Sequence, residues 1–263
     1  MIFDYEPADP AFLPLMSSTW CPIIILAVYL YFVLKVGQDW MEFRKPYNVQ
    51  KAMLIYNALQ IGFNTVLFGL TFWYMFVSPI YDLRCIESLP IDNPNKIIER
   101  SVTYMYYLNK VLDLMDTIFF VVRKSFKQIT TLHVYHHCLM VMFTHGTFMA
   151  YGAGGQYAVI ALLNSLVHMV MYSYYLFTAL YPGSTGSLWW KKYITIMQLA
   201  QFTLIALQSL WVLIFNPSCQ FPMIMHFIQL SQAGVMMAMF GNFYAKSYCS
   251  KKTIEAKSKK IDN

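Results

Sequence analysis

Residues 156–180 read QYAVIALLNSLVHMVMYSYYLFTAL and contain no Asp, Glu, Lys or Arg. This run exceeds the roughly 20 residues that a helix needs to cross a bilayer. The whole chain of 263 residues is 58% hydrophobic and only 12% charged, about half the charge of an ordinary soluble domain. We therefore predict an all-α membrane protein with one domain over 1–263. Its seven transmembrane helices are expected at about 20–36, 58–80, 101–122, 133–151, 156–180, 190–215 and 221–245.

Lysine and arginine residues are concentrated in alternate connections between these spans. Of the 19, fifteen lie in or beside the first, third and fifth connections and the C-terminal tail, whereas three lie in the second connection and Lys110 lies inside a span. Because basic loops stay in the cytosol, this predicts a multi-pass protein with a short lumenal N-terminus and a basic cytosolic tail at about 246–263. The net charge of +6 is dispersed over loops and tail, which favours membrane lipids as partners and argues against nucleic acid.

The predicted orientation separates the cysteines by compartment. Cys85 and Cys219 fall in lumenal loops, where disulfides persist, whereas the other three lie in or near spans or in the cytosol. We expect a disulfide between Cys85 and Cys219 that ties the second loop to the sixth. Two free lumenal thiols remain the alternative, because two cysteines alone fix no geometry.

The third span carries charged residues in NKVLDLMDTIFF. One cation, two anions and a hydroxyl recur there at steps of three and four residues, so they share one helical face. Ionisable groups inside a membrane indicate a functional site, although a self-neutralising structural ion cluster is the alternative. The residues are Lys110, Asp113, Asp116 and Thr117.

Three histidines open the fourth span, in LHVYHHCLM at 132–140. His133, His136 and His137 occupy positions i, i+3 and i+4 and therefore lie on one face. Neutral imidazole can act as a nucleophile, move protons near neutral pH or bind a metal. His145 and His226 stand alone in apolar runs and are interpreted as packing residues.

Two further spans carry polar stripes. In the fifth span Asn164, His168, Tyr172 and Tyr175 form one stripe, whose tyrosines alone would also fit an aromatic belt. The sixth span contains TIMQLAQ, with Thr195, Gln198 and Gln201 on one face, where amides that bond neighbouring helices are the alternative.

The depths of these polar groups along their spans predict a chamber. In four spans they fall in the middle-to-cytosolic half, whereas the lumenal halves carry Phe, Met, Tyr, Leu and Val. This arrangement predicts a polar reaction chamber that continues into an apolar tunnel closed at the lumenal end. The expected substrate has a polar head and a long apolar tail.

Three classes of protein fit a histidine cluster in a membrane. A di-iron desaturase or hydroxylase uses H-x-x-H-H, but needs about eight histidines, and this chain has six. Zinc held by His133, His137 and Asp116 is a related alternative. A seven-helix receptor or transporter would not require an ion cluster beside three histidines. An acyltransferase fits best, because imidazole can attack a thioester and carry the acyl group.

Four motifs in order along the chain resemble those of the very-long-chain fatty acid elongases. KVLDLMDT at 110–117 is similar to K-x-x-E-x-x-D-T, and HVYHH at 133–137 matches H-x-x-H-H. NSLVHMVMYSYY at 164–175 and TIMQLAQ at 195–201 resemble N-x-x-x-H-x-x-M-Y-x-Y-Y and T-x-x-Q-x-x-Q. One departure is Asp113, which stands where the family usually has Glu and is shorter by one methylene.

The resemblance implies a very-long-chain 3-oxoacyl-CoA synthase of the endoplasmic reticulum membrane. Such an enzyme condenses a long-chain acyl-CoA with malonyl-CoA to 3-ketoacyl-CoA, CO2 and CoA, without cofactor or metal. Six of its seven helices would form a barrel around the tunnel. Implied partners are the ketoacyl-CoA reductase, the dehydratase and the enoyl-CoA reductase of the elongation cycle, and homo-oligomers are compatible with the resemblance. The catalytic residues would be His133, His136, His137 and His168, with His136 as nucleophile, and the substrate-binding residues would be Lys110, Asp113, Asp116, Thr117, Asn164, Tyr172, Tyr175, Gln198 and Gln201.

Overall fold

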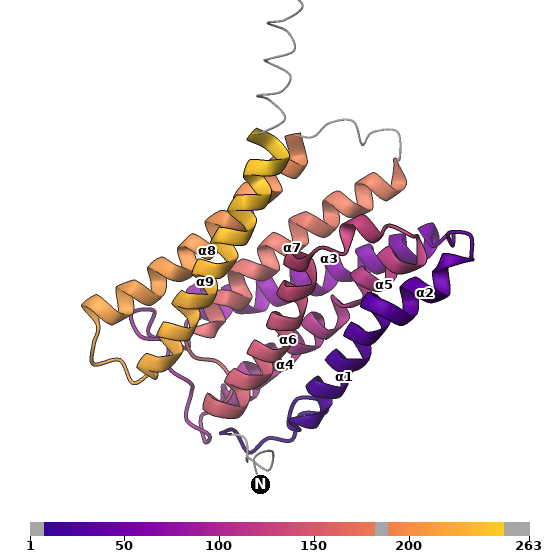
Figure 1. Ribbon diagram of the computed structural model, residues 1–263. Helices are drawn as coiled ribbons and strands as arrows, with labels where there is room; N and C mark the ends of the chain where they lie inside the picture. Colours follow the sequence, from indigo (N-terminus) through magenta and orange to yellow (C-terminus); the bar gives the residue numbers. More distant parts are fainter. Residues whose placement is uncertain (1–7, 182–188, 250–263) are drawn as a thin grey trace, which may run out of the picture. The chain divides into compact units, whose positions relative to one another are not determined.

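The structure is a computed structural model that describes residues 8–181 and 189–249 (Figure 1). Its residues group into two compact units, 1–179 and 180–263, which are described separately. The prediction of a single domain stays a prediction. Most of the basic tail predicted at 246–263 lies outside the described residues.

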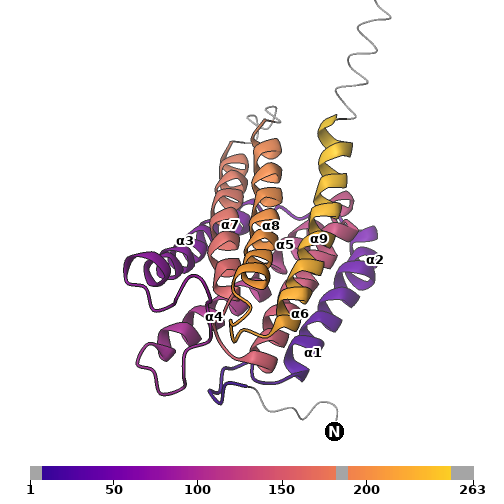
Figure 2. The ribbon, with the colours of Figure 1, turned by 90° about the vertical axis from the view of Figure 1, so that its left-hand side faces the viewer.

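The first unit contains the N-terminal helices, which are joined by turns and short loops except at 78–95, where the connection is longer. Its elements are α1 (Trp20–Tyr31), the π-helical turn η1 (Phe32–Val36), α2 (Gly37–Glu42), α3 (Gln50–Phe72), the π-helical turn η2 (Trp73–Val77), α4 (Lys96–Leu112), α5 (Met115–Val122), the 3-10 turn η3 (Phe126–Gln128), α6 (Thr131–Tyr151) and α7 (Tyr157–Leu180). The second unit is a hairpin of α8 (Trp189–Phe215) and α9 (Met223–Tyr244), which continues into the π-helical turn η5 (Ala245–Cys249), and Figures 1 and 2 show its two helices side by side.

The prediction of an all-α membrane protein is confirmed in part. Across 8–181 and 189–249 the sole β-type pairing is an isolated bridge between Asp82 and Cys85. In the part of the chain that the structure describes, five helical segments are long and apolar enough to cross a membrane: Trp20–Glu42, Gln50–Val77, Tyr157–Leu180, Trp190–Phe215 and Met223–Cys249. The spans predicted at 101–122 and 133–151 are helical but more polar, so the count of seven and the barrel stay predictions.

Helix α4 lies at the centre of the first unit. It packs between α3 and α6, and α6 in turn packs against α1 (Figures 1 and 2). A core of apolar side chains, among them Leu26 of α1, Tyr107 of α4, Val121 of α5 and Phe148 of α6, fills the space between these four helices. The opposite faces of several helices expose large apolar side chains, as a lipid-facing surface requires, and Ile55 of α3 is an example.

The span predicted as one helix at 101–122 is divided into α4 and α5. The break falls at Asp113 and Leu114. There the backbone N–H groups of Leu114, Asp116 and Thr117 donate to the carbonyl oxygens three residues earlier, as in a 3-10 helix, and not four residues earlier. Such a tightened turn inside a helix often marks a functional site. Here it falls within the charged motif.

Candidate active site

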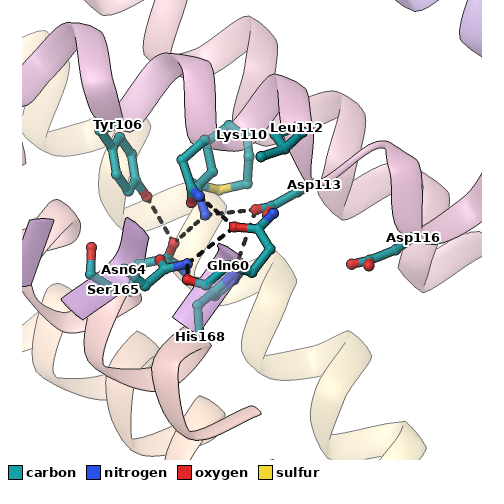
Figure 3. A network of polar contacts seen from close by, with 12 residues as sticks. Gln60, Asn64, Tyr106, Lys110, Leu112, Asp113, Asp116, Ser165 and His168 are labelled. Carbon is teal, nitrogen blue, oxygen red and sulfur yellow. Dashed lines mark hydrogen bonds and ion pairs between the residues drawn. The ribbon is translucent and has the colours of Figure 1, made fainter. Parts of the chain in front are cut away.

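The carboxylate of Asp113 is the centre of a buried polar network (Figure 3). Lys110 Nζ lies 2.8 Å from its Oδ2, and the two side chains are 1% and 2% exposed. Gln60 Nε2 and the Tyr172 hydroxyl donate to Oδ1 at 2.8 and 3.0 Å. His168 Nδ1 lies 3.5 Å from Oδ2. Buried charges need a partner and further hydrogen bonds, and Asp113 has both.

Lys110 connects this carboxylate to α7. Its ammonium donates to Asn164 Oδ1 at 2.8 Å, and the same oxygen accepts from the Tyr106 hydroxyl at 3.1 Å. The ammonium also lies 5.1 Å from the centre of the Tyr106 ring. The cation is therefore fixed in place by an anion, an amide and an aromatic face.

Asp116 shares a donor with Asp113. The Tyr172 hydroxyl lies 2.8 Å from Asp116 Oδ2 as well as 3.0 Å from Asp113 Oδ1. The Tyr172 side chain is buried, and its ring contacts those of His168, Tyr56 and Tyr175. Two acidic groups on one helical face thus meet a single phenol.

The histidine cluster occupies the first two turns of α6. Its position is set by Thr130, the residue before the helix, whose hydroxyl accepts from the His133 backbone N–H at 3.2 Å. Such a cap satisfies an amide at the helix start, and so places the following histidines at the helix end. The ring centres of His133 and His137 are 4.3 Å apart, and those of His136 and His137 are 5.7 Å apart.

A hydrogen bond links this cluster to the charged motif. Thr117 Oγ1 lies 2.8 Å from His133 Nε2. Thr117 follows Asp116 directly, so the two-turn region around the break between α4 and α5 contacts both α6 and α7. The structure therefore brings motifs from three of the four spans that were expected to meet into contact within the first unit.

The remaining predicted residues differ in position. Tyr175 is 38% exposed, and its ring contacts the ring of Tyr172. Gln198 and Gln201 lie on α8 of the second unit, where Gln201 is buried, and their role beside the network stays a prediction. The isolated His145 and His226 are buried.

The sequence motifs missed one side of the network. Both polar atoms of the Gln60 amide, on α3, make hydrogen bonds. Nε2 also donates to the Tyr56 hydroxyl at 3.0 Å, and Oε1 accepts from Asn109 at 2.6 Å and from Asn64 at 3.3 Å. A signal was present, because Asn57, Gln60 and Asn64 recur at helical spacing inside an apolar run and are all buried.

A largely apolar cavity adjoins the network. It is lined by residues of α3, α4, α6, α7 and nearby loops, and its empty volume is about 690 Å³ including space open to the outside. Tyr106 belongs both to the lining and, through its hydroxyl, to the Lys110–Asn164 contact. Glu99 and Gly154 lie at the end of the cavity formed by the start of α4 and the connection between α6 and α7.

The network offers imidazoles and carboxylates that are general metal ligands. Within the part of this cluster that the structure describes, no three such groups have ligand atoms within 4.8 Å of one another. The alternative zinc site at His133, His137 and Asp116 therefore has no preformed ligand set here. That the reaction uses no metal or cofactor stays a prediction.

Comparison with known proteins agrees with the motifs. Residues 14–256 match the GNS1/SUR4 (ELO) family. The chain is 38% identical to very long chain fatty acid elongase F of Drosophila melanogaster over 256 residues, which cover 97% of this chain and 99% of the relative. It is 38% identical to elongase 7 of Rattus norvegicus, with 89% and 83% covered, and 34% identical to elongase 4 of Homo sapiens, with 89% and 73% covered. A match of this extent shows that the chain belongs to the GNS1/SUR4 (ELO) family, together with the very long chain fatty acid elongases.

Proposed function

We propose that the chain is a very-long-chain 3-oxoacyl-CoA synthase, the condensing enzyme of fatty acid elongation. It joins a long-chain acyl-CoA to the two-carbon unit of malonyl-CoA and releases CO2 and CoA. The membership of the chain among the elongases supports the pathway, and the arrangement of the first unit supports the reaction.

The observation that carries the proposal is that Tyr106 belongs both to the apolar cavity and to the buried polar network. Tyr106 is one of the residues that line the apolar cavity, and its hydroxyl donates to the amide oxygen that also accepts from the Lys110 ammonium. An acyl chain in the cavity would thus end at a cation, an amide and buried imidazoles. Ligand sites of this kind are mostly apolar, with a few placed polar groups that orient the substrate.

In the proposed first half-reaction, a His136 nitrogen attacks the thioester carbonyl. The C–S bond breaks, an acyl-imidazole forms, and the proton of the imidazole leaves with CoA as its thiol. His133, His137 and His168 position the reacting groups and transfer protons. Burial protects the acyl-imidazole from water.

In the second half-reaction, malonyl-CoA loses CO2 and leaves an enolate of the CoA ester. The enolate carbon attacks the acyl carbon, the C–N bond breaks, and the imidazole takes up a proton. Lys110 offsets the developing oxyanion, and Asp113 keeps that ammonium in place at 2.8 Å. Asn164, Tyr172, Tyr175, Gln198 and Gln201, together with Asp116 and Thr117, complete the binding of the two CoA esters.

The proposed membrane location and orientation of the enzyme follow from the same assignment as an elongase. It acts in the endoplasmic reticulum membrane, with its N-terminus in the lumen and its C-terminus in the cytosol, beside the other enzymes of the cycle. We propose a lumenal disulfide between Cys85 and Cys219 that ties the second loop to the sixth. Peptide mapping without reductant should recover these cysteines as one linked pair, and recovery of both as alkylated thiols would contradict the pairing.

The test of the reaction is an assay of membranes that contain the chain, with labelled malonyl-CoA and acyl-CoAs of increasing length. Labelled 3-ketoacyl-CoA is expected for long chains. Mass spectrometry after acyl-CoA alone should find the acyl group on the peptide that contains His136. His136→Gln should abolish this adduct and lower turnover at least about 100-fold.

The control is His145→Gln, which changes a buried histidine of the same helix outside the polar network. It should keep both the adduct and turnover. An acyl adduct that persists in full in His136→Gln would assign the nucleophile to another residue. Absence of condensation with every acyl-CoA, in membranes where the protein is folded, would refute the proposed function.

A further inference from the structure

Tyr29 of α1 contacts the candidate site from a helix that carries none of the four motifs. Its side chain is 5% exposed, and its hydroxyl lies 2.7 Å from Thr117 Oγ1, a residue 88 positions further along the chain. Thr117 is fully buried, and its hydroxyl also lies 2.8 Å from His133 Nε2. Tyr29, Thr117 and His133 therefore form a continuous hydrogen-bonded row from α1 to α6.

The hydrogen atoms in this row can be counted. Each hydroxyl has one hydrogen to donate, and in residues 8–181 and 189–249 neither hydroxyl contacts a further acceptor. Both hydrogens find acceptors in a single arrangement: Tyr29 donates to Thr117, and Thr117 donates to Nε2 of His133. If Nε2 carried the hydrogen and donated to Thr117, the Tyr29 hydroxyl, on a side chain that is 5% exposed, would lose its acceptor, which is unfavourable. A hydrogen on Nδ1 is not stranded in this way, because His133 is only partly buried and its Nδ1 is not among the buried polar atoms that lack a partner.

Tyr29 also restrains the rotamer of Thr117. A threonine in a helix commonly turns its hydroxyl to a carbonyl one turn earlier. In this chain Thr71 and Thr144 do so, each at 2.7 Å from the carbonyl oxygen four residues before. Thr117 instead turns outward, where Tyr29 and His133 hold its hydroxyl on two sides.

We infer that Tyr29, acting through Thr117, is a positioning residue that fixes His133 as the tautomer with hydrogen on Nδ1 and a lone pair on Nε2. Which ring nitrogen of a histidine carries the hydrogen is set by the bond that the other makes. The lone pair on Nε2 is occupied by the Thr117 hydrogen, so His133 orients its neighbour His137, whose ring centre is 4.3 Å away, and is not the acyl carrier. This last step rests on the proposed function, whereas the tautomer does not.

The tautomer is tested by nitrogen NMR of the full chain in lipid bilayers, with ring-15N histidine. The signals of His133 are identified as those lost in His133→Gln. We expect a protonated Nδ1 and an unprotonated Nε2 in the unchanged protein, and a mixture of tautomers in Tyr29→Phe. Tyr31→Phe is the control, because Tyr31 lies on the same helix and is 64% exposed, and it should leave the spectrum unchanged. A protonated Nε2 in the unchanged protein, or a Tyr29→Phe spectrum identical to it, overturns the inference.

The effect on catalysis is measured separately. Groups that orient a functional histidine typically contribute about 10- to 100-fold. Tyr29→Phe should lower kcat about 10-fold with little change in KM, Thr117→Val should lower it further, and Thr117→Ser should retain most of it because the hydroxyl remains. An unchanged kcat in Tyr29→Phe, when the unchanged protein turns over, overturns the catalytic part of the inference. If the unchanged protein has no condensing activity, the proposed function fails, and the NMR result still decides the tautomer.

Discussion

Replacement of Lys110 by methionine isolates the energetic role of the buried ion pair. Methionine keeps the length and apolar stem of lysine but removes the ammonium that lies 2.8 Å from Asp113 Oδ2. Removal of one partner of a buried pair usually costs about 3–5 kcal/mol, because a charge is left without compensation. Asp113 Oδ1 would keep its donors Gln60 and Tyr172, so we expect the lower end of this range, about 3 kcal/mol. Asn164 would keep Tyr106 as a donor.

The assay is thermal unfolding of the purified protein in detergent or lipid nanodiscs. For a chain of this size, about 3 kcal/mol corresponds to a fall in Tm of roughly 6–12 °C. The double variant Lys110→Met/Asp113→Asn removes both charges and should recover more than half of the loss, since the uncompensated carboxylate is gone.

The matched control is Arg84→Met at the exposed ion pair with Asp82, whose atoms are 2.9 Å apart. Exposed pairs contribute little, so Tm should not change measurably. A Lys110→Met variant as stable as the unchanged protein would refute the reasoning. A double variant no more stable than the single one would refute it as well, because the cost would then not arise from the unpaired carboxylate.

Two further predictions concern the end of the first unit where α4 begins. Gly154→Ala should destabilise the protein by about 1–3 kcal/mol, because Gly154 has φ +84° and an added Cβ would clash with the Glu99 carboxylate. The control is Gly146→Ala, where an added Cβ meets open space, and this change should be neutral or slightly stabilising. Equal Tm values for the two variants would contradict the prediction. The second prediction concerns pH. Burial alone would raise the pKa of Asp9, but the hydrogen bonds from Arg100 and the Ala11 backbone, together with the charges of Arg100 and Lys96, outweigh burial and hold that pKa below the ordinary value. The carboxylate therefore contributes stability at neutral pH that is lost as pH falls through the lowered pKa. The Tm of Asp9→Asn should be lower than that of the unchanged protein at pH 7, and the two Tm values should converge as pH falls below that lowered pKa. A constant difference between the two would contradict the assignment.

Polar residues inside apolar runs were the informative part of the sequence for the site. Lys110, Asp113 and His133 could be selected from spacing alone, because charges and imidazoles are rare in a membrane interior unless they have a task. The roles of Gln60 and Tyr29 could not be assigned from spacing, because an amide or a phenol in a membrane helix commonly serves only in packing. Their functions depend on which helix lies opposite, and spacing along one helix carries no such information.

Helix boundaries show the same division. The helix predicted at 58–80 begins earlier, at Gln50. The apolar pattern did not show this start, because it is interrupted by Asn57, Gln60 and Asn64, whose side chains are buried inside the unit. The span predicted at 101–122 is broken at Asp113 and Leu114, where side-chain contacts from α3 and α7 hold the carboxylate in a tight turn. Hydropathy averages over such local events.

By itself the amino-acid sequence determined the helical class, the membrane character and the set of polar groups on each helix, because these depend on composition and on the period of one helix. Only the tertiary structure decided that Asp113, which pairs with Lys110, also accepts a hydrogen bond from Gln60, that Tyr172 contacts both carboxylates, and that Tyr29 reaches His133 through Thr117. The physical reason is that a hydrogen bond requires two groups within about 3 Å and in line, and for residues on different helices that distance is set by packing.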